Sequence, residues 1–433
     1  MFFKYLAGEL PEAPPPRPVY ARVDQVEPLD DGDPAPSMLL LDCVDAIWLD
    51  EAKERADHLS DEGFDEADSR ISIVIASSEY LEGLDDDSDD PPEWFHLELG
   101  DPDQGPVVEQ FHNLFQDATE RGVINARPVN PAEGAMLKRL AGWHDIEPTA
   151  QSDIEKLLTG TGPVDAVAIY DVGQGAATAL LSHGIPALYF DLGGSAIGNW
   201  RSFPEPLLRF CTTDDPPVVL SHWDWDHWSS ALRDDRLLHQ RWILPIQDRA
   251  GDLGAVHARF LAMLKTRSAG ICWWGCAIPP ITSPHIGMTV FRARGPQTNR
   301  NESGLALSIA RNHHTVLLPG DASLASVGAG ATSIDHFMVP HHGGRTELDA
   351  IPTPNNRSRS HLVYSYGVGN IYQHPLPKTV RALRRSWKKN AHTALRDGSG
   401  LGHLGIDLTG TSRLSAQPGC GAGMCQLGIR RWI

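Results

Sequence analysis

The sequence predicts an α/β (α+β) protein in two parts, an acidic α+β region over residues 1–158 and a sheet-rich domain over residues 159–433. The length of 433 residues is enough for two domains. Residues 1–160 hold 37 acidic and 11 basic residues, a balance of −26, whereas residues 161–433 hold 19 and 26, a balance of +7. In the second part, apolar runs alternate with glycine-rich turns, which is typical of strands that present polar residues at their ends.

The composition excludes several classes of protein. No run approaches the ~20 consecutive apolar residues of a membrane span, and the start "MFFKYLAGEL" reaches Glu9 before a signal-peptide core develops. We therefore expect a cytoplasmic protein. Six cysteines are too few for a disulfide scaffold. The pairs Cys272/Cys276 and Cys420/Cys425 form either a four-cysteine zinc site or, more simply, unpaired thiols.

The N-terminal part contains a few recognisable elements. The first 35 residues are rich in proline and acid and predict an extended lead-in. Apolar runs over residues 38–51 and 70–80 predict strands, and the acidic residues 81–94 predict a loop. Residues 107–122, "VVEQFHNLFQDATERG", have apolar side chains at helical spacing and predict an amphipathic helix. Three roles are open for this part: occupying a basic groove as a pseudo-substrate, docking a protein partner, or keeping the protein in solution.

The second part has eight strand-like runs. In chain order they are "AVAIYDVGQG", "ATALLSHG", "PALYFDLGG", "PVVLSHWDWDH", "LALSIARN", "HTVLLPGDAS", "HFMVPHHGG" and "HLVYSYGVG". Each is an apolar run that ends in small or polar residues, so we expect buried strands with functional residues in the loops that follow them.

The segment "LSHWDWDHWSS", residues 220–230, concentrates the chemistry. On an extended backbone alternate residues share one side, so His222, Asp224 and Asp226 can converge, and His227 joins from the next turn. Imidazole and carboxylate ligands suit zinc or manganese. The alternative is a solvated acidic turn. Further candidate ligands end two later strands: Asp321, His341 and His342.

These motifs, in this order, resemble the metallo-β-lactamase superfamily and, more narrowly, the metallo-β-lactamase-like domain of ComEC competence proteins, over residues 164–410. The pieces that carry the resemblance are "YDVGQGAATAL", "ALYFDLGG", "LSHWDWDH", "NESGLALSI", "LLPGDA", "VPHHGG" and "YSYGVGNIYQHPLP". The resemblance implies an αββα sandwich, a metal-dependent hydrolase activity and one or two divalent ions (zinc or manganese). It assigns His222 and Asp224 to a first metal position, Asp226 and His227 to a second, Asp321 to both, and His341 or His342 to the second. Of the last two, His341 is slightly favoured because it directly follows the strand.

This chain departs from the superfamily pattern at several positions. Asp224 stands where the common motif has a histidine, and its harder oxygen favours manganese over zinc. Asn301 and Ser303 stand where many relatives place a further histidine, so we expect them to contact substrate beside a weakly held first metal. Ala176 replaces an acid, and Ser229-Ser230 replaces a glycine pair.

The expected chemistry is hydrolysis. A bound metal lowers the pKa of water from ~15.7 towards ~7 and polarises the group under attack. We expect Asp226 to orient that water as well as to bind metal, and His374 in "YQHPLP" to protonate the leaving oxygen or contact the phosphate. The alternative for His374 is a turn residue held by Pro375.

A basic segment follows His374 and bears on the substrate. In "PLPKTVRALRRSWKK" we expect a helix with Lys378, Arg381, Arg385, Lys388 and Lys389 largely on one face, Arg384 nearby and Trp387 as a stacking surface. This is either a track for a phosphate backbone or a solvated basic face. The leading prediction is a DNA nuclease or phosphodiesterase. The alternatives are a hydrolase of a small phosphodiester, such as a cyclic nucleotide or phosphorylcholine-type ester, and a regulatory or binding module with a degenerate site.

Overall fold

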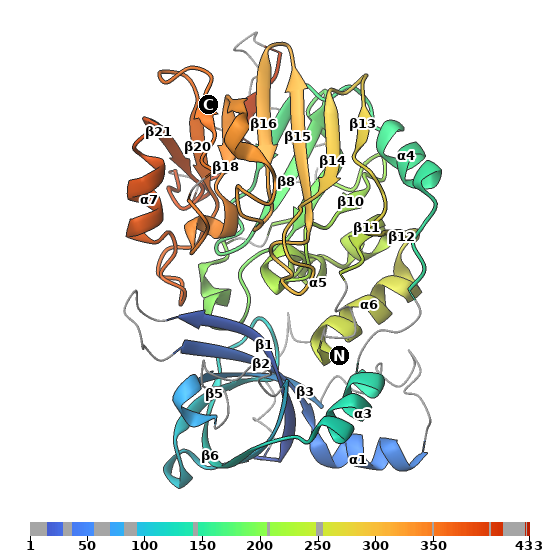
Figure 1. Cartoon of the computed structure of the whole chain (residues 1–433), viewed down its shortest axis with the longest axis vertical. Coiled ribbons are helices and arrows are strands. Elements are labelled where there is room, and N and C mark those ends of the chain that lie inside the picture. The colour runs from blue at the N-terminus through green and yellow to red at the C-terminus, as the bar shows by residue number, and fades with distance from the viewer. Residues whose placement is uncertain are drawn as a thin grey trace. The chain divides into compact units, whose positions relative to one another are not determined.

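The computed structural model describes residues 15–28, 37–55, 70–81, 93–141, 146–205, 208–247, 254–348, 350–397, 400–409, 429 and 431–433. The chain divides into two compact units (Figure 1). The first unit contains residues 1–145 and 249–266, and the second contains residues 146–248 and 267–433. The helix over residues 151–159 therefore belongs to the second unit, whereas the expected boundary at residue 158 assigned most of it to the N-terminal region.

The first unit is built on a closed barrel with the strand order β1-β2-β3-β5-β6-β4, in which all neighbours are antiparallel. Its strands are β1 (Val19–Pro28), β2 (Ser37–Asp45), β3 (Ile71–Ser77), β4 (Trp94–Gly100), β5 (Val107–Phe111) and β6 (Thr119–Pro128). Alternate apolar residues fill the interior, as with Leu39, Leu41 and Cys43 of β2. This alternation is what a barrel with one buried face requires.

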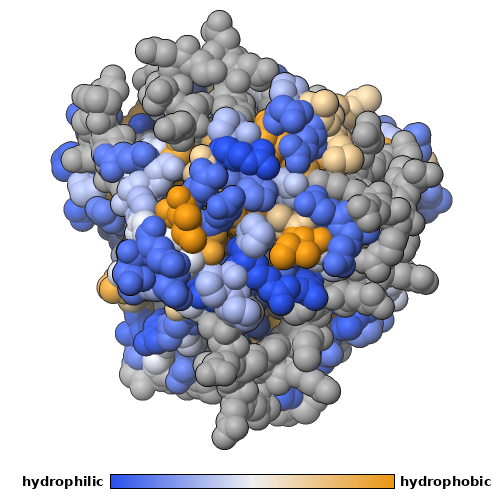
Figure 2. Space-filling view, turned by 90° about the horizontal axis from the view of Figure 1, so that it is seen from below, coloured by the Kyte–Doolittle hydropathy of each residue, from blue (hydrophilic) through white to orange (hydrophobic). Residues whose placement is uncertain are grey.

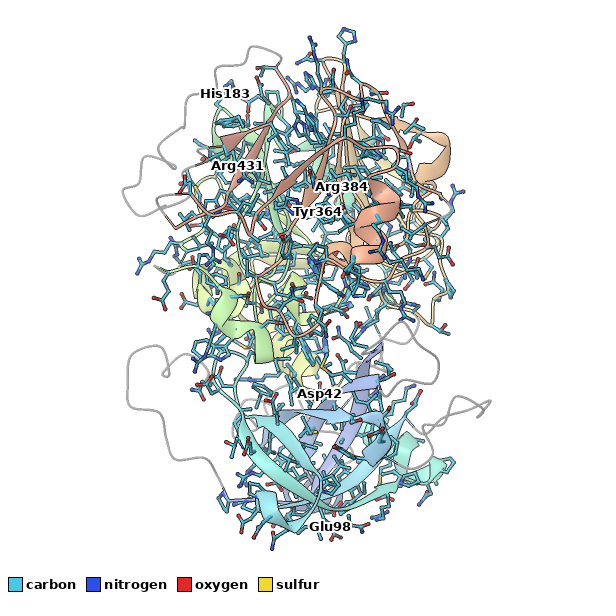
Figure 3. The ribbon with its side chains drawn as sticks, turned by 90° about the vertical axis from the view of Figure 1, so that its left-hand side faces the viewer. Asp42, Glu98, His183, Tyr364, Arg384 and Arg431 are labelled. Carbon is cyan, nitrogen blue, oxygen red and sulfur yellow. The ribbon has the colours of Figure 1, made fainter. Side chains whose placement is uncertain are left out.

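The described residues of this unit also form helices α1 (Ala46–Arg55), α3 (Pro131–Ala141) and α6 (Ala255–Arg267). The start of α6 is fixed by Asp42, whose carboxylate accepts the backbone N–H of Val256 at 3.0 Å. Asp42 lies within the barrel unit (Figure 3). Its side chain and that of His257 are completely buried, and Oδ2 of Asp42 lies 3.6 Å from Nδ1 of His257. Burial raises the pKa of Asp42 against the opposing effect of His257.

Three sequence predictions for this unit are wrong. The strand expected over residues 38–51 ends at Asp45, and the chain continues as helix α1. The expected lead-in contains β1, because Val19 and Ala21 are buried in the barrel and pair with β2 and β4. The expected helix over residues 107–122 is instead β5, a turn and β6. In β5 exposed and buried residues alternate from Val107 to Gln110, which is the period of a strand, and β6 pairs with it. Residues 82–92, which make up most of the predicted loop over residues 81–94, and residues 56–69 lie outside the described residues.

The second unit contains two large sheets. One has the order β12-β11-β10-β9-β8-β7-β22-β23 and the other β13-β14-β15-β16-β18-β20-β21. The first sheet consists of β7 (Ala166–Ile169), β8 (Ala177–Ser182), β9 (Ile185–Leu192), β10 (Val218–Val219), β11 (Arg241–Pro245), β12 (Gly270–Trp274), β22 (Leu404–Asp407) and β23 (Arg431–Trp432). The second consists of β13 (Ile281–Ser283), β14 (Met288–Arg292), β15 (Leu305–Arg311), β16 (His314–Leu318), β18 (His336–Met338), β20 (His361–Tyr364) and β21 (Lys389–His392). Strands β17 (Ser333–Ile334) and β19 (Thr353–Pro354) form a separate two-stranded sheet. All eight runs predicted from the sequence contain strands.

The two large sheets share one core. Side chains from both, such as Val167, Phe190, Leu307 and Val363, belong to a single buried cluster. Neighbouring residues of the second sheet point the other way, against helix α7 (Pro377–Leu383), where Phe337 and Leu383 belong to another buried cluster. Strands buried on both faces explain why their sequences are continuous apolar runs. The remaining helices of the unit are α4 (Gln151–Thr159) and α5 (Ser230–Arg233).

The surface of the described residues is ordinary for a globular chain. None of its helices is long and apolar enough to cross a membrane. On the face in Figure 2, hydrophilic residues predominate among those that are coloured, and the hydrophobic ones form separate spots. Isolated hydrophobic residues of this kind are normal on protein surfaces.

Candidate metal centre

The loop after β10 carries the histidines and aspartates of the "HWDWDH" run. Its backbone is extended at Asp224 and then forms a short 3₁₀ turn over Trp225–His227. The tryptophans hold this loop in place. Trp223 and Trp228 are fully buried, and their indole N–H groups donate to the carbonyls of Pro245 and Trp223. The apolar residues of the run are therefore its anchors, which leaves the polar side chains to face the centre.

Strand ends of the second unit bring five of the predicted ligands together. Nε2 of His227 lies 3.2 Å from Oδ1 of Asp321, which follows β16. Nε2 of His342, which follows β18, lies 3.0 Å from Oδ2 of Asp226 and 3.8 Å from Oδ2 of Asp321. Two overlapping groups of possible ligand atoms result: His222, His227 and Asp321, and Asp226, His227 and His342.

The three histidines of these groups are oriented by their Nδ1 atoms. Nδ1 of His222 lies 2.9 Å from the Ser221 hydroxyl, Nδ1 of His227 lies 2.9 Å from Asp191, and Nδ1 of His342 lies 2.7 Å from a main-chain carbonyl. Their Nε2 atoms are buried and have no hydrogen-bond partner in the described part of the chain. Buried nitrogens left without a partner are costly unless a ligand satisfies them. Held Nδ1 atoms and converging Nε2 atoms are the arrangement of metal-binding histidines, so these residues fit a divalent ion.

The charges of the centre compensate one another. Burial would raise the pKa of Asp321, but the rings of His227 and His342 outweigh it and hold that pKa well below its usual range. Burial likewise opposes protonation of His227, yet Asp321 and Asp191 raise its pKa well above the usual range. The carboxylates therefore favour a positive charge at the imidazoles. A divalent ion supplies that charge when the histidines lose their protons.

The structure places the adjacent histidines His341 and His342 differently. Both His341 and His342 adopt left-handed backbone conformations in the turn after β18. His342 is buried and points its ring at Asp226 and Asp321. His341 is half-buried, its Nδ1 lies 3.3 Å from the carbonyl of Arg345, and its backbone N–H donates to Asp321. The side chain of His342, rather than that of the slightly favoured His341, therefore lies with Asp226 and His227 among the possible ligand atoms.

Asp224 has a partner that the sequence reading missed. Its Oδ1 lies 3.1 Å from Nη2 of Arg300, and both side chains are largely buried. Asp224 belongs to neither group of ligand atoms, although its Oδ2 lies 3.4 Å from Nε2 of His222. Burial raises the pKa of Asp224, but Arg300 and then His222 hold it well below its usual range. The sequence signal was weak: Arg300 directly precedes Asn301 in "NRNESG".

Asn301 and Ser303 make hydrogen bonds within their own turn. The Ser303 hydroxyl donates to the carbonyl of Asn299 at 2.7 Å and accepts from Gln247 at 2.8 Å, so this buried group is already occupied. The backbone N–H of Asn301 donates to the side chain of Asn299. This turn lies next to the loop that carries the "HWDWDH" run, because the N–H of Leu305 donates to the carbonyl of Ser221.

The glycine-rich segments before the centre support the loop's backbone. The carbonyl of Asp226 accepts N–H groups from Ala176 and Gly194. The hydroxyls of Ser229 and Ser230 donate to the carbonyls of Gly194 and Gly193. Ala176, Ser229 and Ser230 are thus part of the hydrogen-bonded packing around the backbone of the loop that carries Asp226.

His374 lies beside the centre. It precedes a cis peptide bond to Pro375, is buried, and its ring centroid lies 5.0 Å from that of His341. Its Nδ1 has no hydrogen-bond partner among the described residues. Burial and then His341 and His342 hold its pKa well below the usual range, so the ring is neutral at neutral pH. A neutral imidazole can donate one hydrogen bond or accept a proton, but it is a poor proton donor.

The basic segment differs from the expected continuous helix. Helix α7 ends at Leu383, so only part of the segment is helical, but the predicted cations are all exposed: Lys378, Arg381, Arg384, Arg385, Lys388 and Lys389. Figure 3 labels Arg384 at the end of α7. The exposed Arg357 and Arg359 add to this basic group, and Nη2 of Arg357 donates to the carbonyl of Arg385. Trp387 is not a stacking surface, because it is buried and its Nε1 donates to the carbonyl of Pro352.

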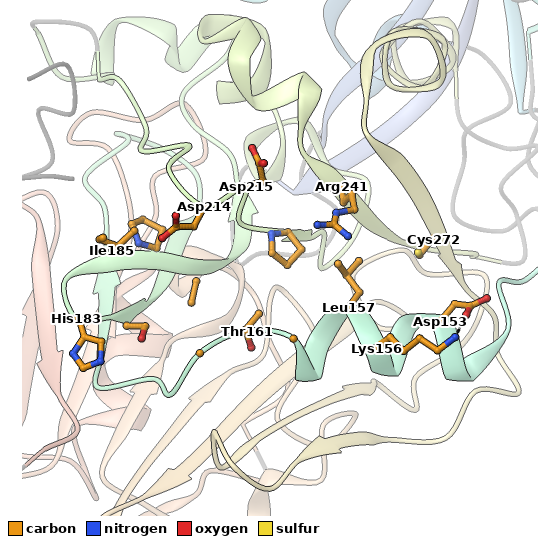
Figure 4. Close-up of a pocket in the computed structure, with 16 residues that line it drawn as sticks. Asp153, Lys156, Leu157, Thr161, His183, Ile185, Asp214, Asp215, Arg241 and Cys272 are labelled. Atoms are coloured by element: carbon orange, nitrogen blue, oxygen red, sulfur yellow. Dashed lines mark hydrogen bonds and ion pairs between the residues drawn. The ribbon is translucent and has the colours of Figure 1, made fainter. Parts of the chain in front are cut away.

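A pocket of about 500 Å³ lies at another edge of the first sheet (Figure 4). Strands β9, β10 and β11 are parallel. The pocket is lined at their N-terminal ends by Ile185, Pro217 and Arg241, whereas the metal loop follows the C-terminal end of β10. Its charged residues have mixed signs: Asp153, Asp214 and Asp215 line it together with Lys156 and Arg241, and the Lys156 amine points to Asp153. No residue of the centre lines it, so it has no part in the chemistry considered below.

The cysteine prediction is only partly covered by the structure. Cys272 is half-buried and lines the pocket, and Cys276 is exposed. Burial raises the pKa of Cys272. Cys420 and Cys425 lie outside the described residues.

No protein-family model and no curated protein matches this chain.

Proposed function

We propose that the second unit is a metal-dependent hydrolase and that its activity is cleavage of DNA phosphodiesters. The observation that carries this proposal is the convergence of three buried Nε2 atoms, none of which makes a hydrogen bond within the described residues, on the carboxylates of Asp226 and Asp321. A solvated acidic turn, the alternative for this motif, is not buried in this way. Two sheets with a shared core and ligands at strand ends are also what the metallo-β-lactamase resemblance implies, so we propose an αββα relationship to that superfamily.

The ligand set we propose is Asp226, His227, Asp321 and His342, with His222 beside them. A divalent ion bound there would lower the pKa of an attacking water and neutralise charge on the phosphate. Imidazole with carboxylate oxygens suits zinc or manganese. Asp191 and Ser221 keep the Nε2 atoms of His227 and His222 directed at the ion.

Asp226 is the ligand that meets the solvent. Its side chain is 20% exposed, against 4% for Asp321, so water and substrate arrive on its side. We therefore assign Asp226 the second role of orienting the attacking water. His374 is neutral at neutral pH because of its surroundings. We accordingly assign it to donating a hydrogen bond to a phosphate oxygen rather than to protonating the leaving group.

The basic group supports a polyanionic substrate. Exposed cations from α7, from the turn after it and from the loop before β20 belong to the same unit as the centre. Fixed positive charges of this kind bind a phosphate backbone without regard to sequence. A small phosphodiester would not need them, which is why DNA is preferred.

The test is cleavage of labelled single- and double-stranded DNA with manganese, zinc, magnesium or EDTA. We expect metal-dependent cleavage that falls to background in Asp226→Ala/His227→Ala and persists in His341→Ala, the matched control next to a ligand. Cleavage unaffected by the double substitution would place the active site elsewhere. Absence of cleavage by protein that binds metal would favour the small-phosphodiester alternative, and absence of metal binding would favour a degenerate binding module.

A further inference from the structure

Arg300 occupies an unusual position for a centre that binds cations. Its Nη2 lies 3.1 Å from Oδ1 of Asp224, and the two side chains are only 18% and 4% exposed. Asp224 is the one acid of the "HWDWDH" run that joins neither group of ligand atoms among the described residues. The carboxylate expected to bind a first metal therefore already faces a permanent positive charge.

The turn that carries Arg300 is fixed by its own hydrogen bonds. The carbonyl of Arg300 accepts from Gln247 at 2.6 Å. The side chain of Asn299 accepts the N–H groups of Asn301 and Glu302, and the Glu302 carboxylate accepts from residues of the segment after β16: Ser323 and Ser326. Arg300 is thus held by a braced turn, and its pairing with Asp224 does not depend on a mobile arm.

The partners of the other carboxylates differ chemically from Arg300. Asp226 and Asp321 face His342 and His227, which release a proton and become ligands when a metal binds. A guanidinium cannot lose its proton in a protein and has no lone pair to offer a metal. A divalent ion at Asp224 would therefore be repelled by Arg300, whereas an ion between Asp226, His227 and His342 displaces only protons.

We propose that Arg300 takes the place of the first metal, so that this chain binds a single divalent ion at the position of Asp226, His227, Asp321 and His342. His222, Asp224 and Arg300 then form a polar cluster beside the ion rather than a second binding position. The proposal rests on the proposed function only in that the centre binds metal. It concerns the number of ions, which can be measured without activity.

The test is a titration of chelator-treated full-length protein with Mn²⁺ and, separately, Zn²⁺ by calorimetry, with metal content of dialysed samples as a second readout. We expect one ion per chain for the wild type and two for Arg300→Gln, which removes the charge but keeps polar atoms in place. The double variant Asp224→Asn/Arg300→Gln should return to one, because the second ion would need the carboxylate. Arg294→Gln, an exposed arginine nearby in sequence, is the control and should bind one.

The outcomes separate this inference from the proposed function. Two ions in the wild type would overturn the role of Arg300 while leaving a metal-dependent hydrolase intact. One ion in both the wild type and a folded Arg300→Gln, verified by circular dichroism, would also overturn it. Failure of every variant to bind metal would remove both proposals together.

Discussion

The carboxylate of Asp191 lies 2.9 Å from Nδ1 of His227, and both side chains are almost completely buried. Asp191, the penultimate residue of β9, has a left-handed backbone. Its carboxylate also accepts two hydrogen bonds from Ser221, one from the N–H and one from the hydroxyl. The carboxylate of Asp191 therefore holds the proton of His227 on Nδ1, so that Nε2 faces the centre. Partners of this kind commonly tune metal-binding histidines.

Replacing Asp191 with asparagine should weaken metal binding without unfolding the chain. The amide keeps the shape of the side chain but no longer enforces one tautomer of His227. We expect a loss of about 10–100-fold in affinity for the divalent ion, measured by competition with a chromophoric chelator. Asp215→Asn, at an exposed residue, is the control. Equal affinity in Asp191→Asn and the wild type would show that His227 is not a ligand.

Gly193 packs closely against the backbone of Asp226 and His227. A Cβ at this position would collide with the carbonyl of Asp226 and with the backbone of His227. Gly193→Ala should therefore cost about 1–3 kcal/mol of stability through overpacking and reduce metal affinity at the same time. Thermal unfolding with and without metal measures both effects. Gly134→Ala in α3, where a Cβ meets nothing closer than 3.8 Å, should leave metal affinity unchanged and raise stability by about 0.5–1 kcal/mol.

The sequence predicted the sheet-rich unit better than the barrel for a physical reason. Strands such as β18 and β20 are buried on both faces, so their apolar runs are easy to recognise in the sequence. In the barrel, strands with one buried face produce weaker signals. The Val107–Phe111 run placed apolar residues close to Leu114 and Phe115 of the following turn, and the combined spacing imitated a helix.

The candidate ligands were predictable because they follow strands, but their partners were not. Arg300 and Asp191 reach the centre from other segments of the chain, and nothing in their local sequence indicates a contact with Asp224 or His227. The choice of His342 over His341 likewise depends on a left-handed turn that neither residue type requires. Tertiary contacts, rather than local pattern, decide these features.

The basic group makes a prediction about DNA binding that is independent of catalysis. Arg381→Gln and Arg385→Gln should each weaken binding of single-stranded DNA in EDTA and lower the slope of log affinity against log salt by about 1. Fluorescence anisotropy at several salt concentrations measures both quantities. Trp387→Phe should lower the melting temperature but leave DNA affinity unchanged, because the indole is buried. Unaltered salt slopes in the arginine variants would show that these residues do not contact phosphates.

A row of stacked histidines in the second sheet predicts sensitivity to acid. His336 stacks on His361 with ring centroids 5.6 Å apart and on His314 with centroids 6.3 Å apart. Burial, together with His361 and His314 and against the opposing effect of Asp335, lowers the pKa of His336 from 6.5 to about 4. Lys389 of the neighbouring strand β21 lies opposite His361, and its positive charge lowers the pKa of His361. The folded chain therefore keeps His336 neutral where the unfolded chain protonates it.

The stability of the folded chain should fall in acid because of proton uptake by the unfolded state. Between about pH 6.5 and pH 4 the unfolded state binds a proton at this position that the folded state does not, so stability falls as the pH is lowered through that range. His336→Phe keeps an aromatic ring in the stack but removes the titration. We expect it to reduce the stability difference between pH 7.5 and pH 5 by about 1–2 kcal/mol, as measured by urea unfolding. The same substitution at exposed His285 is the control. If His336→Phe and the wild type lost equal stability at pH 5, the stack would not be the source of the acid sensitivity.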